Sequence, residues 1–221
     1  MAATLATLRT RAQRRADLEN SNFVGTAEWT DLINEAYVEL WDLLVAAYAD
    51  WFLSSSEFTL SGSTSTQALP ADFYKLVELD YVTGPGTDDF DPVPRFTFRA
   101  RNRGDRAYRV MGNLIRISPA TQAPGTYRAW YIQGPTLLVN DADSTSALIP
   151  TGMAEQFIPL VAGIKANTKQ KKDSSELERE LARLTKRIET MTVDRDTGEP
   201  TRILEVDDPL RGFGVPRLPP P

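Results

Sequence analysis

Apolar residues recur at three- and four-residue steps in three stretches of the chain, a spacing typical of helices that bury one face. We therefore predict helices at about residues 4–19, 27–50 and 151–192. The second stretch has the most regular face, and Thr26 stands where its hydroxyl would cap the first turn. The apolar positions on this face are Trp29, Leu32, Ile33, Ala36, Tyr37, Leu40, Leu43, Leu44, Ala47 and Tyr48.

The third helical stretch has two distinctive features. Pro159 removes a backbone hydrogen bond if it lies beyond the first turn, so we expect a late start or a kink there. Further along, residues 174–192 carry an apolar seam at alternating four- and three-residue steps, as in a short heptad pattern. Two heptads are too few for an independent coiled coil, so this seam should pack between helices or between subunits. Its positions are Leu177, Leu181, Leu184 and Ile188.

Between about residues 56 and 140 the apolar pattern changes to an alternation with period two, which is typical of strands. Val77, Leu79 and Tyr81 alternate with acidic residues, and Gly112-Asn113 separates two short apolar runs as a two-residue hairpin turn would. The predicted fold class is therefore α+β and mainly α: a helical bundle with a small antiparallel β region inserted between helices.

The last stretch, residues 194–221, is rich in proline and glycine and cannot form a core of its own. It nevertheless carries more large apolar residues than a disordered tail normally has. We therefore predict that residues 1–193 form the folded domain and that residues 194–221 form an extended arm that docks on a partner. The apolar residues of this arm are Ile203, Leu204, Val206, Leu210, Phe213, Val215 and Leu218.

Composition narrows the possible chemistry. The 221 residues include no cysteine and no histidine. This excludes thiolate metal sites, disulfides and cysteine nucleophiles, and it removes the most common general base. We expect no enzyme activity, no catalytic or metal-binding residues and no cofactor. A net charge of −5 argues against a protein that binds nucleic acid or an anionic membrane over its whole surface. No signal peptide or membrane span is evident, so we expect synthesis in a cytoplasm without a membrane anchor.

Arginines crowd one segment of the predicted β region, between aromatic residues. Guanidinium groups bind phosphate and carboxylate through paired hydrogen bonds, so this segment is a candidate loop for contacting nucleic acid or an acidic partner. The alternative is a solvated strand edge whose charges discourage pairing with other strands. The arginines are Arg95, Arg99, Arg101, Arg103, Arg106 and Arg109.

Several short motifs follow one another in order along nearly the whole chain, and together they resemble the head-to-tail adaptor (connector) proteins of tailed bacteriophages. None of them is diagnostic alone, and the resemblance thins after about residue 204. The motifs are Arg15-Ala16-Asp17-Leu18-Glu19-Asn20, Glu28-Trp29-Thr30, Leu69-Pro70-Ala71-Asp72-Phe73, Tyr108-Arg109-Val110-Met111-Gly112-Asn113 and Arg195-Asp196-x-Gly198-Glu199-Pro200.

The resemblance implies a structural protein of the virion neck, made in the bacterial host. It implies a ring of twelve copies that joins the portal protein to a tail or nozzle protein, with the C-terminal arm on the portal. Genomic DNA would pass through the ring without specific binding, during ejection for example, and an acidic lumen would repel its phosphates. Two alternatives stay open: a tail-completion or stopper protein, and a nucleic-acid-binding or packaging factor that uses the Arg95–Arg109 segment.

Overall fold

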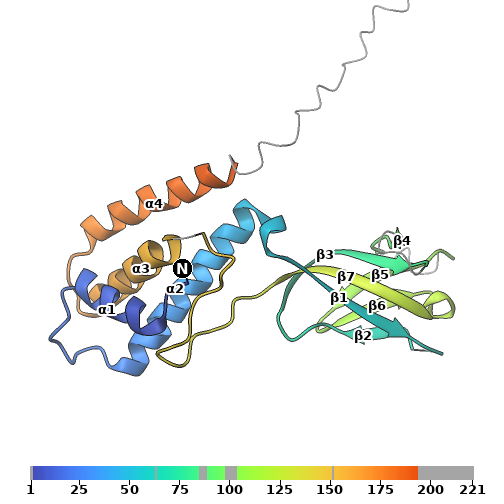
Figure 1. Cartoon of the computed structure of the whole chain (residues 1–221), viewed down its shortest axis with the longest axis horizontal. Coiled ribbons are helices and arrows are strands. Elements are labelled where there is room, and N and C mark those ends of the chain that lie inside the picture. The colour runs from blue at the N-terminus through green and yellow to red at the C-terminus, as the bar shows by residue number, and fades with distance from the viewer. Residues whose placement is uncertain (1, 63, 85–88, 98–103, 151, 194–221) are drawn as a thin grey trace, which may run out of the picture.

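The computed structural model describes residues 2–62, 64–84, 89–97, 104–150 and 152–193. These residues form a helical lobe and a β lobe that lie side by side along the long axis of the molecule (Figure 1). The β lobe is inserted in the chain between the second and third helices, as the sequence predicts. The α-helices of the described chain are α1 (Leu5–Arg15), α2 (Thr26–Ala47), α3 (Met153–Lys169) and α4 (Ser175–Val193).

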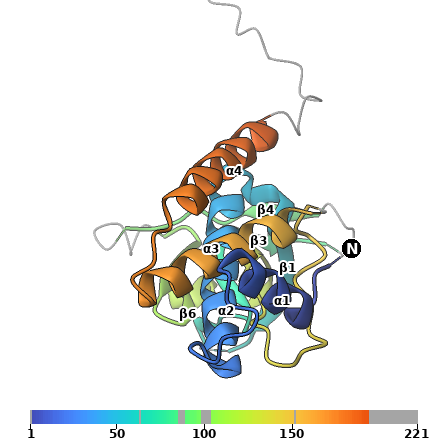
Figure 2. The same ribbon diagram turned by 90° about the vertical axis from the view of Figure 1, so that its left-hand side faces the viewer.

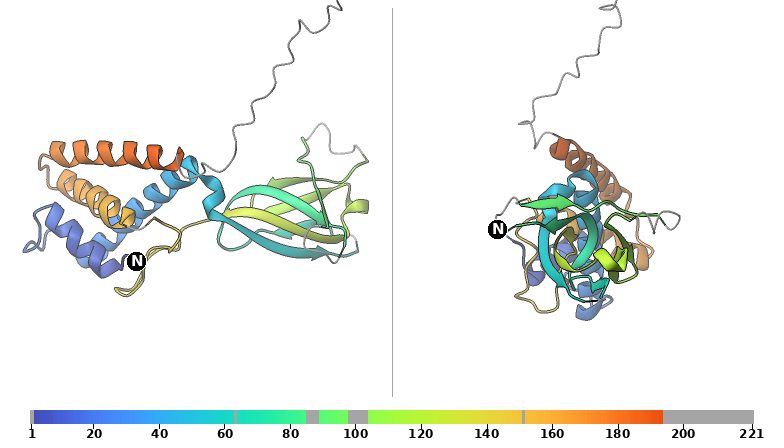
Figure 3. Two further views of the ribbon diagram at one scale, coloured as in Figure 1. Left: turned by 45° about the horizontal axis from the view of Figure 1, so that its top comes forward. Right: turned by 90° about the vertical axis from the view of Figure 1, so that its right-hand side faces the viewer.

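The helical lobe is built around α3, which lies between α1 and α4 and also packs against α2 (Figures 2 and 3). The predicted face of α2 lines this core, and Trp29, Ile33 and Leu40 are fully buried in it. The expected N-cap of α2 is wrong by one residue. Gly25 has the extended backbone of the capping position, whereas Thr26 is already helical, and no side chain caps this end.

The helical stretch predicted at residues 151–192 consists of two helices. α3 ends at Lys169, and Lys171 has a left-handed backbone with φ of 56°, which reverses the chain so that α4 folds back over α3 and α2. Pro159 lies inside α3, and the helix begins before it at Met153. A proline at this position leaves the Glu155 carbonyl without its usual helical donor. Arg11 Nη1 of α1 donates to that oxygen at 3.5 Å, which compensates for the missing bond.

The β lobe contains two antiparallel sheets that enclose one core (Figure 3, right). The larger sheet has the strand order β1-β7-β3-β4 and the smaller has the order β2-β6-β5. The core between them includes Leu79, Ile115 and Tyr127. The strands are β1 (Leu53–Leu60), β2 (Thr66–Ala68), β3 (Phe73–Val82), β4 (Phe90–Pro92), β5 (Ala107–Met111), β6 (Leu114–Ser118) and β7 (Gly125–Gln133).

The predicted hairpin is confirmed: β5 and β6 pair from Met111 opposite Leu114, with only Gly112 and Asn113 between them. Gly112 has φ of 59°, the positive value that a tight primed turn needs at its first central residue. The α+β class is likewise confirmed, but its mainly α character is not. The β region forms two complete sheets, and it begins slightly earlier than expected, at Leu53, where three consecutive serines hide the alternation.

The two lobes are joined by the 3-10 helix η1 (Ala49–Phe52) and by the segment that follows β7. The Trp41 ring of α2 packs on Phe52 with a centroid distance of 4.5 Å, and its Nε1–H donates to the Gln133 carbonyl at 3.1 Å. The Tyr74 hydroxyl of β3 donates to Asp42 of α2 at 2.7 Å. Both connections between the lobes are therefore fixed by side chains of α2.

Candidate interaction surfaces

The segment that returns from the β lobe, residues 134–150, is held along the helical lobe by hydrogen bonds. The Asn34 side chain of α2 accepts from the Leu138 amide and donates to the Leu138 carbonyl, each at 2.9 Å. One turn along α2, the Tyr37 hydroxyl accepts from the Ser146 amide at 2.9 Å, and burial raises the pKa of this phenol. The chain before α1 also pairs with this segment, through a bridge between Thr4 and Ser144.

The turn within that segment is stabilised by Asp143, whose carboxylate accepts from the amides of Asn140 and Val139 at 2.7 and 2.8 Å. These two amides hold the pKa of the Asp143 carboxyl below its usual range. The acidic residues at 141 and 143 therefore have local structural partners, because the neighbouring Asp141 bonds to Arg9 at 2.7 Å.

The arginines of α1 form ion pairs with other parts of the helical lobe. Arg9 bonds to Asp141, Arg11 to Glu155 of α3, and Arg15 to Glu180 of α4. Such exposed pairs stabilise a protein little, but they show which elements lie next to one another. α1 is therefore connected to α3, to α4 and to the return segment, and its positive charges are matched within the chain.

The arginine segment predicted to contact a partner is only partly described, because Arg99, Arg101 and Arg103 lie outside the described residues. The Arg106 guanidinium lies over the Tyr81 ring at 3.4 Å and donates to the Gln122 carbonyl at 3.0 Å, so it has partners inside the β lobe. Arg95 lies beside Tyr108; burial raises the pKa of that phenol, and Arg95 acts in the opposite direction. The described arginines of this segment therefore do not gather into one basic surface.

Arg109 instead lies on the outer face of the smaller sheet, directly opposite Arg116 of β6. The neighbouring positions Tyr108, Ile115 and Ile117 point into the core, which fixes the outward direction of the two arginines. Arg116 is not among the arginines predicted to contact a partner. Its position opposite Arg109 nevertheless follows from the sequence. Each arginine lies three residues from the Gly112-Asn113 turn, and a two-residue turn places residues at equal distances from it opposite each other.

The outer face of the larger sheet contains a shallow apolar groove. Its floor carries the Trp130 indole, whose Nε1–H donates to the largely buried Asp80 carboxylate at 2.7 Å. Beside it, Arg128 bonds to Glu57 at 2.7 Å and lies over the Phe90 ring at 5.1 Å. We call this surface the groove face; its apolar lining residues are Leu53, Val77, Phe90, Pro92 and Trp130.

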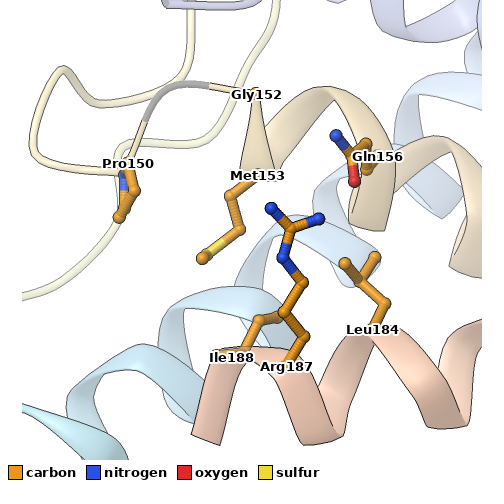
Figure 4. Close-up of a pocket in the computed structure, with 7 residues that line it drawn as sticks. All are labelled: Pro150, Gly152, Met153, Gln156, Leu184, Arg187 and Ile188. Carbon is orange, nitrogen blue, oxygen red and sulfur yellow. The ribbon is translucent and has the colours of Figure 1, made fainter. Parts of the chain in front are cut away.

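The predicted seam of α4 faces the helical lobe. Ile188 is buried, Leu181 and Leu184 pack against the core, and Leu177 is half-buried. Near the start of α3, Leu184, Arg187 and Ile188 of α4 face Met153 across a small cavity of about 40 Å³ (Figure 4). A cavity of this size holds a water molecule or two but no larger ligand.

The arm residues predicted to dock, from Ile203 to Leu218, lie outside the described residues. Within the described chain, no group of three or more acidic, cysteine or histidine side chains is arranged to hold a metal ion. No helix in the same residues is long and apolar enough to cross a membrane.

These observations define a two-lobed α+β protein whose distinctive features are exposed surfaces available for contact with other molecules. The chain belongs to the SU10 adaptor protein family, because the sequence model of that family matches residues 3–204 and so includes both lobes. This confirms the predicted relation to phage head-to-tail adaptors, and the chain is accordingly a structural adaptor of a phage virion neck. No curated protein matches the sequence.

Proposed function

We propose that copies of this chain form a ring in the virion neck that joins the portal protein to the tail and surrounds the path of the DNA. The observation that carries this proposal is the family match, which runs through both lobes from residue 3 to residue 204. A ring would also account for the separate exposed surfaces of the chain, because each subunit of a ring contacts its neighbours as well as the parts above and below it.

Preventing synthesis of this chain in infected cells tests the proposed role. We expect heads and tails to accumulate separately, because the joining part is missing. Restoring the chain from a plasmid should restore joined virions. Normal joined virions in the absence of the chain would contradict the proposal.

We further propose that residues 194–221 are the arm that attaches the ring to the portal. Residues up to Val193 belong to α4, which is anchored through Ile188 in the core and the ion pair between Glu180 and Arg15. The arm therefore starts from a fixed helix, and its apolar residues would be buried only against a partner.

Truncation after Glu205 tests the arm. Because the removed residues follow the helical lobe, the shortened protein should keep the circular dichroism spectrum and unfolding transition of the full chain. It should no longer sediment with purified portal rings. A control truncation after Pro216 keeps most of the apolar residues of the arm and should retain attachment. Attachment of the protein truncated after Glu205 at full strength would refute this role.

The lumen of the ring is proposed to be acidic, in line with the net charge of −5 per chain. Like charge would keep DNA phosphates from binding as the duplex passes. Salt dependence separates this role from that of a nucleic-acid-binding or packaging factor. Binding of DNA through arginines would weaken steeply as salt rises, whereas an apolar contact with the portal would not. A bore lined with basic side chains would contradict the acidic lumen.

A further inference from the structure

The β lobe has two outer faces that point in opposite directions, because its two sheets cover the same core (Figure 3). One is the groove face. The other, which we call the hairpin face, is formed by Arg109 and Met111 of β5 with Leu114 and Arg116 of β6. Met111 and Leu114 flank the hairpin turn and are 37% and 42% exposed.

Both faces leave large apolar side chains in solvent. On the groove face, Leu53 and Val77 are 39% and 44% exposed, and they lie beside Phe90, Pro92 and Trp130. Single exposed apolar residues are common on proteins, but contiguous groups of them mark surfaces that contact another molecule. Two such side chains project from the hairpin face, and five apolar side chains line the groove on the other face.

The charges on the two faces are opposite in sign. The strands of the smaller sheet, β2, β5 and β6, carry Arg109 and Arg116 and no acidic residue, so the hairpin face is basic. The groove face has the reverse composition: its lining includes the carboxylates of Glu78 and Asp80 and no basic side chain, and the neighbouring Arg128 already bonds to Glu57.

We infer that the hairpin face of one copy docks on the groove face of a second copy of this chain. Met111 and Leu114 enter the groove beside Val77 and Trp130, and the Arg109–Arg116 pair meets the carboxylate of Glu78. The opposite charges and the match between projecting and hollowed apolar surfaces identify the partner as the same chain.

This contact is heterologous, because it joins two different faces, and each copy keeps one face free for the next copy. Contacts of this kind generate a ring when the rotation closes and a filament when it does not. The inference deepens the proposed function and rests on it for closure of the ring, since the contact itself requires only two copies.

Disulfide cross-linking tests the contact directly, because the natural chain contains no cysteine. In the full-length Val77→Cys, Met111→Cys double variant, oxidation should produce a ladder of covalent oligomers on a non-reducing gel. Each single variant should give dimers at most. A control that pairs Met111→Cys with Ala46→Cys, on the exposed side of α2, should give no ladder. Absence of a ladder above this control would overturn the inference.

Charge reversal in the double-cysteine background tests the choice of partner. Arg116→Glu or Glu78→Arg alone should reduce the yield of oligomers severalfold, and the two together should restore it. The same reversal at Lys186→Glu, which is exposed on α4, should leave the ladder unchanged. A ladder insensitive to both reversals would overturn the inference. Loss of DNA binding by Arg116→Glu with unchanged cross-linking would assign the arginine pair to nucleic acid instead.

Cross-linking in virions separates this inference from the proposed function. A ladder from the purified chain, with the chain absent from the neck, would leave the contact standing and remove the adaptor ring. A chain found in the neck whose Val77→Cys and Met111→Cys positions do not cross-link there would retain the ring and remove this contact.

Discussion

Asn34 illustrates how one side chain fixes the path of a long segment. Its amide group satisfies both the N–H and the C=O of Leu138, at 2.9 Å each, and so ties the return segment to α2. An unpaired buried polar group costs about 1–3 kcal/mol, more than the net gain of a typical hydrogen bond. The conformation of the return segment therefore depends more on this residue than its half-exposed position indicates.

Replacing this side chain should be costly. We expect Asn34→Ala to lower the free energy of unfolding by about 1–3 kcal/mol, because two backbone groups of Leu138 lose their partners. Urea unfolding followed by circular dichroism measures the change. Asn22→Ala, at an exposed position before α2, is the matched control and should change stability by less than about 0.5 kcal/mol. Equal effects of the two substitutions would show that the Asn34 bonds contribute nothing.

At the scale of single elements, β7 depends on the glycine at which it begins. Gly125 has φ of 139°, a backbone conformation that residues with a side chain rarely adopt, and an added Cβ would collide with the Tyr81 ring. Tyr81 in turn holds Arg106 against its face. The start of the central strand and the packing of this arginine are thus coupled through one position.

Gly125→Ala should therefore destabilise the β lobe by about 2 kcal/mol or more, because backbone strain and overpacking act together. The matched control is Gly134→Ala, directly after the same strand, since Gly134 has no positive φ and an added Cβ would meet its neighbours only at ordinary contact distances. The control should leave the unfolding midpoint nearly unchanged. A Gly125→Ala variant as stable as the natural protein would contradict the described start of β7.

α4 depends on its apolar seam. Ile188 is buried, and truncating a buried isoleucine costs about 2–5 kcal/mol. Ile188→Ala should increase amide hydrogen exchange throughout α4 while exchange in the β lobe stays unchanged. Leu177→Ala, at the half-buried start of the seam, should have a smaller effect. Equal protection of α4 in the natural protein and in Ile188→Ala would contradict the packing of this helix.

The elements also show how far sequence reasoning extends. The face of α2 and the turn at Gly112 were predictable because local period and backbone preference determine them. The division between α3 and α4 was not, since the left-handed position at Lys171 is one that glycine usually occupies. This helix end is stabilised by bonds from the amides of Lys171 and Lys172 to the carbonyls of Thr168 and Asn167. The pairing of Arg109 with Arg116 was only partly predictable, because it depends on the register of two strands and not on a local sequence preference.

In the molecule as a whole, the helical lobe and the β lobe have different roles. The helical lobe is cross-connected by ion pairs and by the bonds that Asn34 makes to the return segment, and Trp41 bonds to the last residue of β7. The β lobe, held at a fixed position, presents the groove face and the hairpin face on opposite sides. A rigid subunit with two complementary faces suits an assembly in which many identical contacts must form at once.

A cryo-EM reconstruction of the virion neck would show whether this chain forms a ring at the junction of head and tail. We expect a ring of two-lobed subunits between portal and tail, with the hairpin face of each subunit on the groove face of its neighbour. Density for this chain away from the portal–tail junction, or as isolated subunits that do not touch, would contradict the claim.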